Sequence, residues 1–312
     1  MKINKLQLAL AAAIILIIAI RLAAAPFYRQ VLKPNKDKLP RALATWIEKR
    51  DSRQPESPII YRPEETIKVL EGWTLENVGA YLDSFATWSR ADFDKVAGQP
   101  MLDYRQESAE NQLPDFSERF SFLADKPAHY GLEGFLFPDT YRVFADASAE
   151  EVVIKMLENF DRKLTEEMRA EIAKQGKTIY DIIIMASLIE KEAPINYRDA
   201  ENRDARLVSG IFWNRLRIGQ ALQSDATLSY LFNDNKPAHS GSELTVDSPY
   251  NSYKYRGLPP TPICNPGLKA IEAAIYPLET NYFYFLTTLD GKEIYYARTY
   301  AEHLQNKYKY LK

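Results

Sequence analysis

Hydrophobic positions follow two different periods along the chain, and the two periods predict both strands and helices. Ile67 and Val69 alternate with polar residues, as in a short half-buried strand. A Glu71-Gly72 turn follows, and Thr74 can then cap a helix. The apolar residues of that helix recur at helical spacing, at Leu75, Val78 and Leu82. Strand, turn and capped helix together predict the start of a compact α+β module.

The most apolar helix is predicted just before a cluster of charges. Residues 182–189 carry no charge, so this helix is expected to be buried on all sides. Thr178 and Asp181 resemble a capping box at its start, with the shorter Asp in place of Glu or Gln. Pro194 cannot extend the helix, which therefore ends in the charged tripeptide at 190–192.

The remaining pattern predicts a mixed α+β fold without internal repeats. Two helices are expected within 148–176, with Val152, Met156 and Phe160 forming an apolar stripe, and Gly176 ends the second. A further helix is predicted at about 204–218, and another begins at Leu268. Near the carboxyl terminus, Asp290-Gly291 separates two aromatic-rich segments and predicts a β-hairpin.

The amino-terminal segment is predicted to be a membrane anchor. Residues 6–28 are apolar apart from Gln7 and Arg21, which is close to the roughly 20 residues that a transmembrane helix needs. A cleavable signal peptide is the alternative, but Pro26 would follow the small-residue cleavage site. We therefore expect an uncleaved anchor over 1–28, followed by a Pro-rich and charged linker over 29–65.

Composition excludes several function classes. A formal net charge of −2 gives no general affinity for nucleic acid. The single cysteine, Cys264, cannot form an internal disulfide and is expected to be a small buried residue. His129, His239 and His303 match no zinc-binding spacing, so no metal or cofactor is predicted.

Glu190 is the strongest candidate for acid–base chemistry. It shares a helix face with small and apolar residues, and it lies at the carboxyl end of the helix, where the dipole disfavours a negative charge. Both effects raise the pKa of a carboxyl group, as a general acid requires, although Lys191 opposes them. A solvated helix end is the alternative, and it is the commoner case for such residues.

Polar residues gather after the predicted helix at 204–218. Gln223, Ser224, Asp225 and Thr227 crowd a short segment, as in a groove that binds oligosaccharides. A loop that caps the next helix, with Asp225 as N-cap, explains the same residues. The spacing alone favours the capping loop.

Four segments carry a family resemblance. "LEGFLFPDTY", "ASLIEKEA", "GIFWNRLRIGQALQSDATLSY" and "YNSYKYRGLPPTPICNPGLKAIEAA" resemble, in order and spacing, the endolytic murein transglycosylases of the YceG-like family. The resemblance implies a membrane-anchored α+β protein, with a small LysM-like subdomain at 66–125 and a mixed α+β catalytic domain at 126–312. Ala193 stands where the family pattern has Thr, and "SDAT" replaces a commoner D-P-T pattern.

The resemblance also implies an activity. The family cleaves peptidoglycan glycan strands internally, between N-acetylmuramic acid and N-acetylglucosamine, and leaves a 1,6-anhydromuramic end. The first Glu of the E-K-E motif, Glu190, is the implied catalytic residue. The expected partners are glycan strands, the cytoplasmic membrane and peptidoglycan synthases, with the catalytic domain outside the inner membrane. The candidate saccharide contacts are Gln223, Asp225, Asn251, Tyr253 and Asn265.

Two other functions are compatible with these residues. A membrane-anchored murein-binding adaptor would use the same groove without cleavage. A hydrolytic muramidase would pair Glu190 with Asp225, since ordinary glycosidases use two carboxylates. Glu192 points about 200° away from Glu190 around the helix axis, so it is expected to have an orienting or structural role.

Overall fold

The computed structural model describes residues 35–45, 62–84, 87–108, 112–193, 195, 201–234, 236, 239–288 and 293–311. The chain divides into two compact units, Met1–Tyr61 and Arg62–Lys312. In the first unit the described residues comprise a short 3-10 helix, η2 (Lys36–Lys38), and helical residues 41–45. The predicted anchor over 1–28 lies outside the described residues, and none of the described helices is long and apolar enough to cross a membrane.

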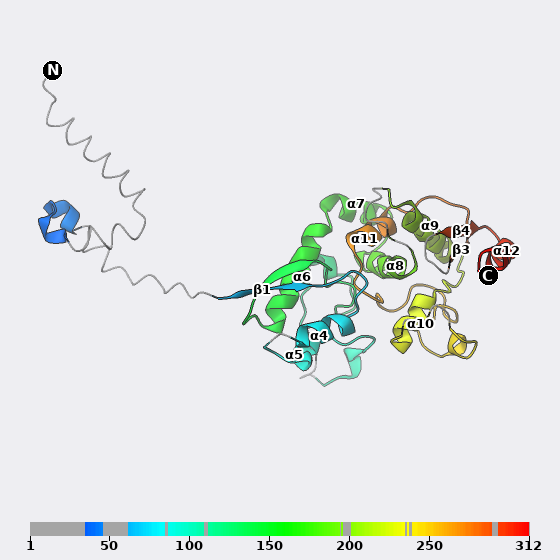
Figure 1. Cartoon of the computed structure of the whole chain (residues 1–312), viewed down its shortest axis with the longest axis horizontal. Coiled ribbons are helices and arrows are strands. Elements are labelled where there is room, and N and C mark those ends of the chain that lie inside the picture. The colour runs from blue at the N-terminus through cyan, green and yellow to red at the C-terminus, as the bar shows by residue number, and fades with distance from the viewer. Residues whose placement is uncertain are drawn as a thin grey trace, which may run out of the picture. The chain divides into compact units, whose positions relative to one another are not determined.

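The second unit is a mixed α+β structure (Figure 1). Its amino-terminal part contains β1 (Glu64–Lys68), α4 (Leu75–Asp83), α5 (Arg90–Ala97), η3 (Tyr104–Gln106), η5 (Ser121–Leu123) and β2 (Thr140–Phe144). Its middle part contains α6 (Ala149–Lys163), α7 (Glu166–Lys174), α8 (Ile179–Glu192) and α9 (Arg203–Arg217). Its carboxyl-terminal part contains α10 (Asp225–Phe232), η6 (Glu243–Thr245), α11 (Leu268–Ile275), β3 (Tyr284–Thr287), β4 (Ile294–Ala297) and α12 (Tyr300–Tyr310).

The described strands form two small antiparallel sheets. β1 pairs with β2 so that Ile67 lies opposite Tyr141, and both side chains are buried. β3 pairs with β4, which confirms the predicted hairpin, although its turn at 289–292 lies outside the described residues. The first sheet therefore joins the amino-terminal module to a segment that follows it by more than seventy positions in the chain.

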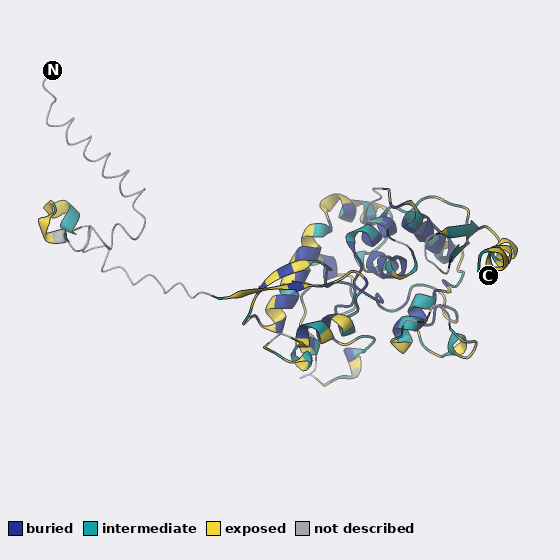
Figure 2. Cartoon of the chain, viewed as in Figure 1, coloured by how far each residue is buried: buried dark blue, intermediate teal, exposed yellow. Residues whose placement is uncertain are grey.

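Helix α8 forms the centre of the second unit. The predicted capping box is present, with Thr178 accepting from the backbone N–H of Asp181 and the Asp181 side chain accepting from Thr178. All residues from 182 to 189 are buried, and α8 is dark blue along this stretch (Figure 2). Helices α7, α9, α10 and α11 pack around it. The expectation of a fully buried helix ending at Glu192 is confirmed.

Local sequence signals explain which other helices could be predicted. Thr74 caps α4, and Leu75, Val78 and Leu82 form its buried face as expected. Helices α6, α7 and α9 also lie where the apolar stripes place them. The sequence pattern did not predict α5 or α12: α5 buries only Phe93 and Ala97, and α12 buries no residue, so neither has an apolar stripe.

One hydrophobic core runs through the second unit. Ile67 and Leu75 from the amino-terminal module belong to the same buried cluster as Ile183 of α8. Gly134 makes this packing possible, because its φ is +89° and a Cβ at this position would lie 2.5 Å from Pro262. The division at 125/126 into a LysM-like subdomain and a catalytic domain stays a prediction, and the two parts share this core.

Candidate active site

Glu190 occupies the last turn of α8, close to the start of α11. Its Oε2 accepts a hydrogen bond from the backbone N–H of Gly267 at 3.0 Å, and Gly267 is the N-cap of α11. The side chain is only partly exposed. The rigid buried helix behind it therefore holds this carboxyl group at a fixed place near the surface.

The environment of Glu190 raises its pKa to about 7, chiefly because burial disfavours the charged form. The backbone N–H of Gly267 acts in the opposite direction, as does the ammonium group of Lys191, while the negative charge of Glu71 raises the pKa further. The sequence predicted the direction of this shift. It did not indicate Glu71 or Gly267, because both come from segments distant in the chain.

The turn between β1 and α4 lies against the end of α8. Gly72 has a φ of +76°, and a Cβ on it would lie 3.7 Å from Cγ of Glu190 and 3.6 Å from Nζ of Lys191. The backbone N–H of Gly72 donates to the carbonyl oxygen of Asn265 at 2.9 Å. The amino-terminal module thus contributes directly to the surroundings of the candidate acid.

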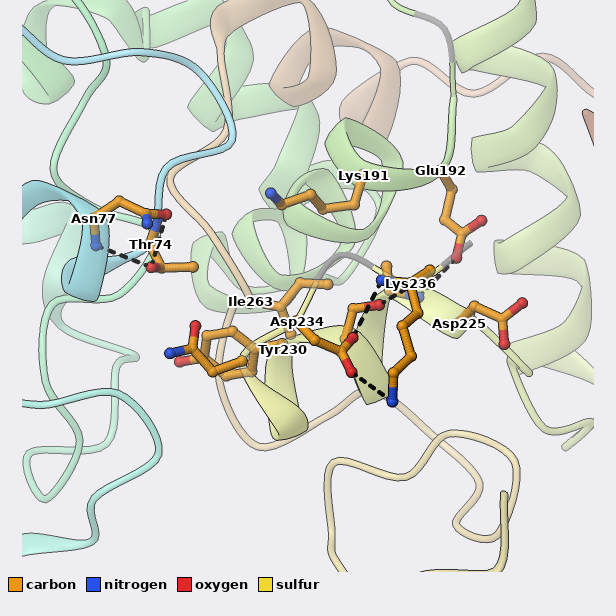
Figure 3. A pocket seen from close by; sticks show the side chains of 12 residues that line it. Thr74, Asn77, Lys191, Glu192, Asp225, Tyr230, Asp234, Lys236 and Ile263 are labelled. Atoms are coloured by element: carbon orange, nitrogen blue, oxygen red, sulfur yellow. Dashed lines mark hydrogen bonds and ion pairs between the residues drawn. The ribbon is translucent and has the colours of Figure 1, made fainter. Parts of the chain in front are cut away.

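A groove of about 340 Å³ opens beside the end of α8 (Figure 3). Thr74 and Asn77 of the α4 region form one wall, and residues of α10 and the loop after it form the other. Lys191 and Glu192 extend into the groove from α8 in different directions. Glu190 is not among the lining residues, although Lys191 and Glu192, the next two residues in the chain, are. The full lining is Thr74, Asn77, Lys191, Glu192, Asp225, Ala226, Ser229, Tyr230, Asn233, Asp234, Lys236 and Ile263.

Glu192 connects α8 to the start of α10. Its Oε1 accepts from the hydroxyl of Ser224 at 2.5 Å and from the backbone N–H of Ala226 at 3.3 Å. Burial raises the pKa of this carboxyl group as well. Ser224, and not Asp225, is the N-cap of α10. These contacts fit the orienting role expected for Glu192.

Three of the candidate saccharide contacts lie close together at the surface. Gln223 is exposed, has a φ of +50°, and donates its backbone N–H to the carbonyl oxygen of Ser252 at 3.0 Å. Asp225 lines the groove and accepts from the hydroxyl of Tyr253 at 2.9 Å. The predicted polar segment after α9 is therefore next to the groove.

The other two candidates make structural hydrogen bonds, and saccharide contact by either of them stays a prediction. Asn251 and Asn265 are fully buried. The Asn251 amide donates to two backbone carbonyl oxygens and accepts from the N–H groups of Tyr253 and Lys254, so it holds its loop together. Asn265 donates to the carbonyl oxygen of Trp73 and accepts from the N–H of Leu136, at 2.9 Å each. Every side-chain nitrogen and oxygen of these two amides therefore has a backbone partner.

A model of the YceG-like family matches residues 40–309 of the chain. The protein belongs to the YceG-like family. A crystal structure of a yceG-like protein from Listeria monocytogenes has a TM-score of 0.64 and 28% sequence identity to this chain, covering 85% of it and 80% of the other. The YceG-like fold is thus found over most of the described residues.

Two relatives of this YceG-like chain are named endolytic murein transglycosylase. The protein from Bacillus subtilis (strain 168) is 33% identical over 249 residues, which are 78% of this chain and 65% of the relative. The protein from Streptococcus pneumoniae serotype 2 is 28% identical over 271 residues, which are 83% of this chain and 46% of the relative. The chain therefore spans about half to two thirds of the length of these relatives.

Glu133 is a buried acid that the sequence analysis of this YceG-like chain missed. Only 3% of it is exposed, and burial raises the pKa of its carboxyl group to about 8. It accepts from the backbone N–H of Leu75, the first residue of α4, at 3.0 Å, and from the hydroxyl of Tyr230 at 3.0 Å. The available signal was a charged residue inside the otherwise apolar segment "GLEGFLFP".

Proposed function

We propose that the chain is an endolytic murein transglycosylase that cleaves the bond between N-acetylmuramic acid and N-acetylglucosamine within glycan strands. The observation that supports this most is the environment of Glu190. Its carboxyl group, held at the end of a rigid buried helix and followed by the groove-lining Lys191 and Glu192, has a pKa of about 7 and a backbone N–H donor. The names of the two relatives support the substrate class.

A pKa near 7 suits both halves of this reaction. In the first half, protonated Glu190 gives its proton to the glycosidic oxygen as the bond to C1 of the muramic residue breaks. In the second half, the carboxylate accepts the proton of the sugar's 6-hydroxyl as that oxygen bonds to C1. No water is consumed, and the enzyme returns to its protonated state. One carboxyl group is sufficient, in contrast to the two of ordinary glycosidases.

The neighbours of Glu190 support each protonation state in turn. Burial and the charge of Glu71 favour the protonated form before cleavage. The N–H of Gly267 stabilises the carboxylate that exists between the two proton transfers. We further propose that Gln223, Asp225 and Tyr253 contact the glycan strand. Asp225 lines the groove, Tyr253 donates a hydrogen bond to it, and Gln223 is exposed two residues before it.

We also propose that residues 1–28 anchor the protein in the cytoplasmic membrane, with the groove on the outer side, where murein and its synthases are. The support is the apolar run over residues 6–28. Protease treatment of intact spheroplasts tests this topology. Digestion of the second unit is expected, and complete protection would place it on the cytoplasmic side and contradict the proposal.

The activity is tested with the full chain, purified in detergent and incubated with sacculi. Mass spectrometry is expected to show 1,6-anhydromuramic ends on internal cleavage products. Reducing ends in their place would indicate a hydrolytic muramidase. Binding to sacculi without any product would indicate an adaptor, and either result would overturn the proposal.

A further inference from the structure

A loop after α10 brings together three side chains that can bind a metal ion. They are Asp234, His239 and Glu243, and their ligand atoms all lie within 4.8 Å of one another. In the part of the chain that the structure describes, this is the one such group of three. Asp234 also lines the groove, so the cluster lies at the groove's edge (Figure 3).

His239 has an unused nitrogen that faces this cluster. Its side chain is 0% exposed, and its Nδ1 has no hydrogen-bond partner. The closest carboxylate oxygen in the cluster, Oε2 of Glu243, is 3.8 Å from Nδ1, which is too far for a hydrogen bond. Buried polar atoms without a hydrogen-bond partner are rare in folded proteins. A metal ion that binds to the atom is one explanation for such a case.

The other nitrogen of His239 has a neighbour that can orient the ring. Nε2 lies 3.1 Å from the hydroxyl oxygen of Ser229. When Nε2 carries the proton and donates it to Ser229, Nδ1 has a free lone pair directed at the cluster. Metal-binding histidines commonly have this arrangement, with the second nitrogen donating to a neighbouring group that orients the ring.

A lysine ammonium group already lies between the two carboxylates. Nζ of Lys236 is 3.1 Å from Oδ2 of Asp234 and 2.6 Å from Oε1 of Glu243. Half of the Lys236 side chain is exposed, so it can leave without disrupting buried contacts. The other oxygen of Glu243 is held by the backbone N–H and the hydroxyl of Ser240, at 2.7 and 2.8 Å. The two oxygens that face Lys236 are therefore oriented toward a cation.

We propose that Asp234, His239 and Glu243 bind a divalent cation of the zinc class, in competition with the ammonium group of Lys236. One imidazole and two carboxylates are a donor set that suits Zn²⁺, with bonds of about 2.0–2.2 Å. Magnesium is less well matched, because it prefers an octahedral shell of oxygen atoms. The three ligands approach one another when the ion binds, and Lys236 moves out into solvent.

An ion at this site would stiffen one wall of the groove. Asn233, Asp234 and Lys236 belong to that wall, and Glu243 begins η6. A bound cation links the end of α10 to η6 across the loop between them. The site is thus a structural feature of the wall, and it does not depend on the proposed transglycosylase activity.

Titration with ZnCl₂ of the full chain, purified without a histidine tag, tests this inference by calorimetry. One Zn²⁺ per chain is expected, with affinity that falls at acidic pH because the imidazole must be neutral to bind. His239→Ala is expected to weaken binding by more than about tenfold. Lys236→Met is expected to tighten it, because the competing cation is gone. MgCl₂ is expected to give no comparable binding.

His303→Ala is the matched control. His303 also has a buried Nδ1 without a hydrogen-bond partner, but it belongs to no such carboxylate cluster among the described residues. Unchanged zinc affinity in this variant is expected. The inference is overturned if wild-type protein binds no Zn²⁺, if His239→Ala binds it as well as wild type, or if Lys236→Met fails to bind more tightly. Should His239→Ala fail to fold, the Lys236→Met comparison decides alone.

Discussion

The hydroxyl of Tyr230 donates to Oε2 of Glu133 at 3.0 Å, and the same carboxyl group accepts from the N–H of Leu75. Tyr230 belongs to α10 and Leu75 to α4, so one buried side chain connects the elements that form the two walls of the groove. The separation of these walls therefore depends on an acid that no proposed chemical step uses.

Glu133 is expected to make stability depend on pH. Its pKa in the folded protein is about 8, compared with an ordinary value of 4.5. The folded state thus binds more protons than the unfolded state between these values, and its stability falls as pH rises from about 4.5 through 8. Glu133→Gln mimics the protonated form and is expected to flatten this dependence. Urea unfolding at pH 5, 7 and 9 provides the measurement, and equal slopes in both proteins would contradict it.

Replacement of Glu190 by Gln is expected to reduce turnover of sacculi by about 10²- to 10⁴-fold, because the amide can neither donate nor accept the proton. Glu192→Gln is the matched control, since it lies two residues away and its contacts are with Ser224 and Ala226. We expect it to retain most of the turnover number. An equal loss of activity in the two variants would contradict this expectation and indicate that Glu192, which lines the groove, acts as the acid.

Activity is expected to fall above about pH 7, because kcat/KM reports the protonated form of Glu190 in the free enzyme. Glu71→Gln removes a negative charge that raises this pKa, so the decline is expected to begin at lower pH. The full profile of kcat/KM against pH is measured for both proteins. A midpoint that stays the same in Glu71→Gln would show that Glu71 does not act on the reacting group.

Asn265→Ala is expected to cost stability more than substrate affinity. The substitution leaves the buried N–H of Leu136 without this partner, at about 1–3 kcal/mol, whereas the carbonyl oxygen of Trp73 loses one donor and keeps the backbone N–H at position 265. The free energy of unfolding in urea and the KM for glycan strands are compared. A large rise in KM with unchanged stability would contradict this expectation and support Asn265 as a saccharide contact.

Gly134→Ala is expected to destabilise the fold more than Gly176→Ala. Both glycines have positive φ, which costs a side chain about 1–2 kcal/mol. A Cβ at position 176 meets nothing within 4 Å, whereas one at 134 lies 2.5 Å from Pro262 and 2.9 Å from Ile183. Overpacking adds about 1–3 kcal/mol at position 134. Thermal unfolding of both variants checks the order, and equal shifts in Tm would show that the Pro262 loop moves freely.

The sequence was most informative where a local rule determines structure. Thr178, Asp181 and Pro194 predicted both ends of α8, because capping and helix termination act over a few residues. The direction of the pKa shift of Glu190 was predicted in part from its apolar helix face, and burial is the largest cause of that shift.

Partners that are distant in the chain were beyond such rules. No local sequence pattern predicts the hydrogen bond from Gly267 to Glu190 or the one from Tyr230 to Glu133. Asn251 and Asn265 show a second difficulty: an amide in a polar loop can bind a sugar or a backbone group equally well, and only the fold decides which is present. Ser and Asp are both favoured at the N-cap position, so the sequence alone could not decide between Ser224 and Asp225 as the N-cap of α10.

The bond from Asn265 to the carbonyl oxygen of Trp73 spans 192 positions. The amino-terminal part of the chain is synthesised first. The turn that contains Trp73 can therefore form its hydrogen bond with Asn265 only after most of the polypeptide has been made. A fragment that ends before residue 265 would expose apolar side chains of the hydrophobic core. The turn would also lack its hydrogen bond to Asn265. Premature cleavage by a protease, or a nonsense mutation late in the gene, would therefore damage the region that emerged earliest.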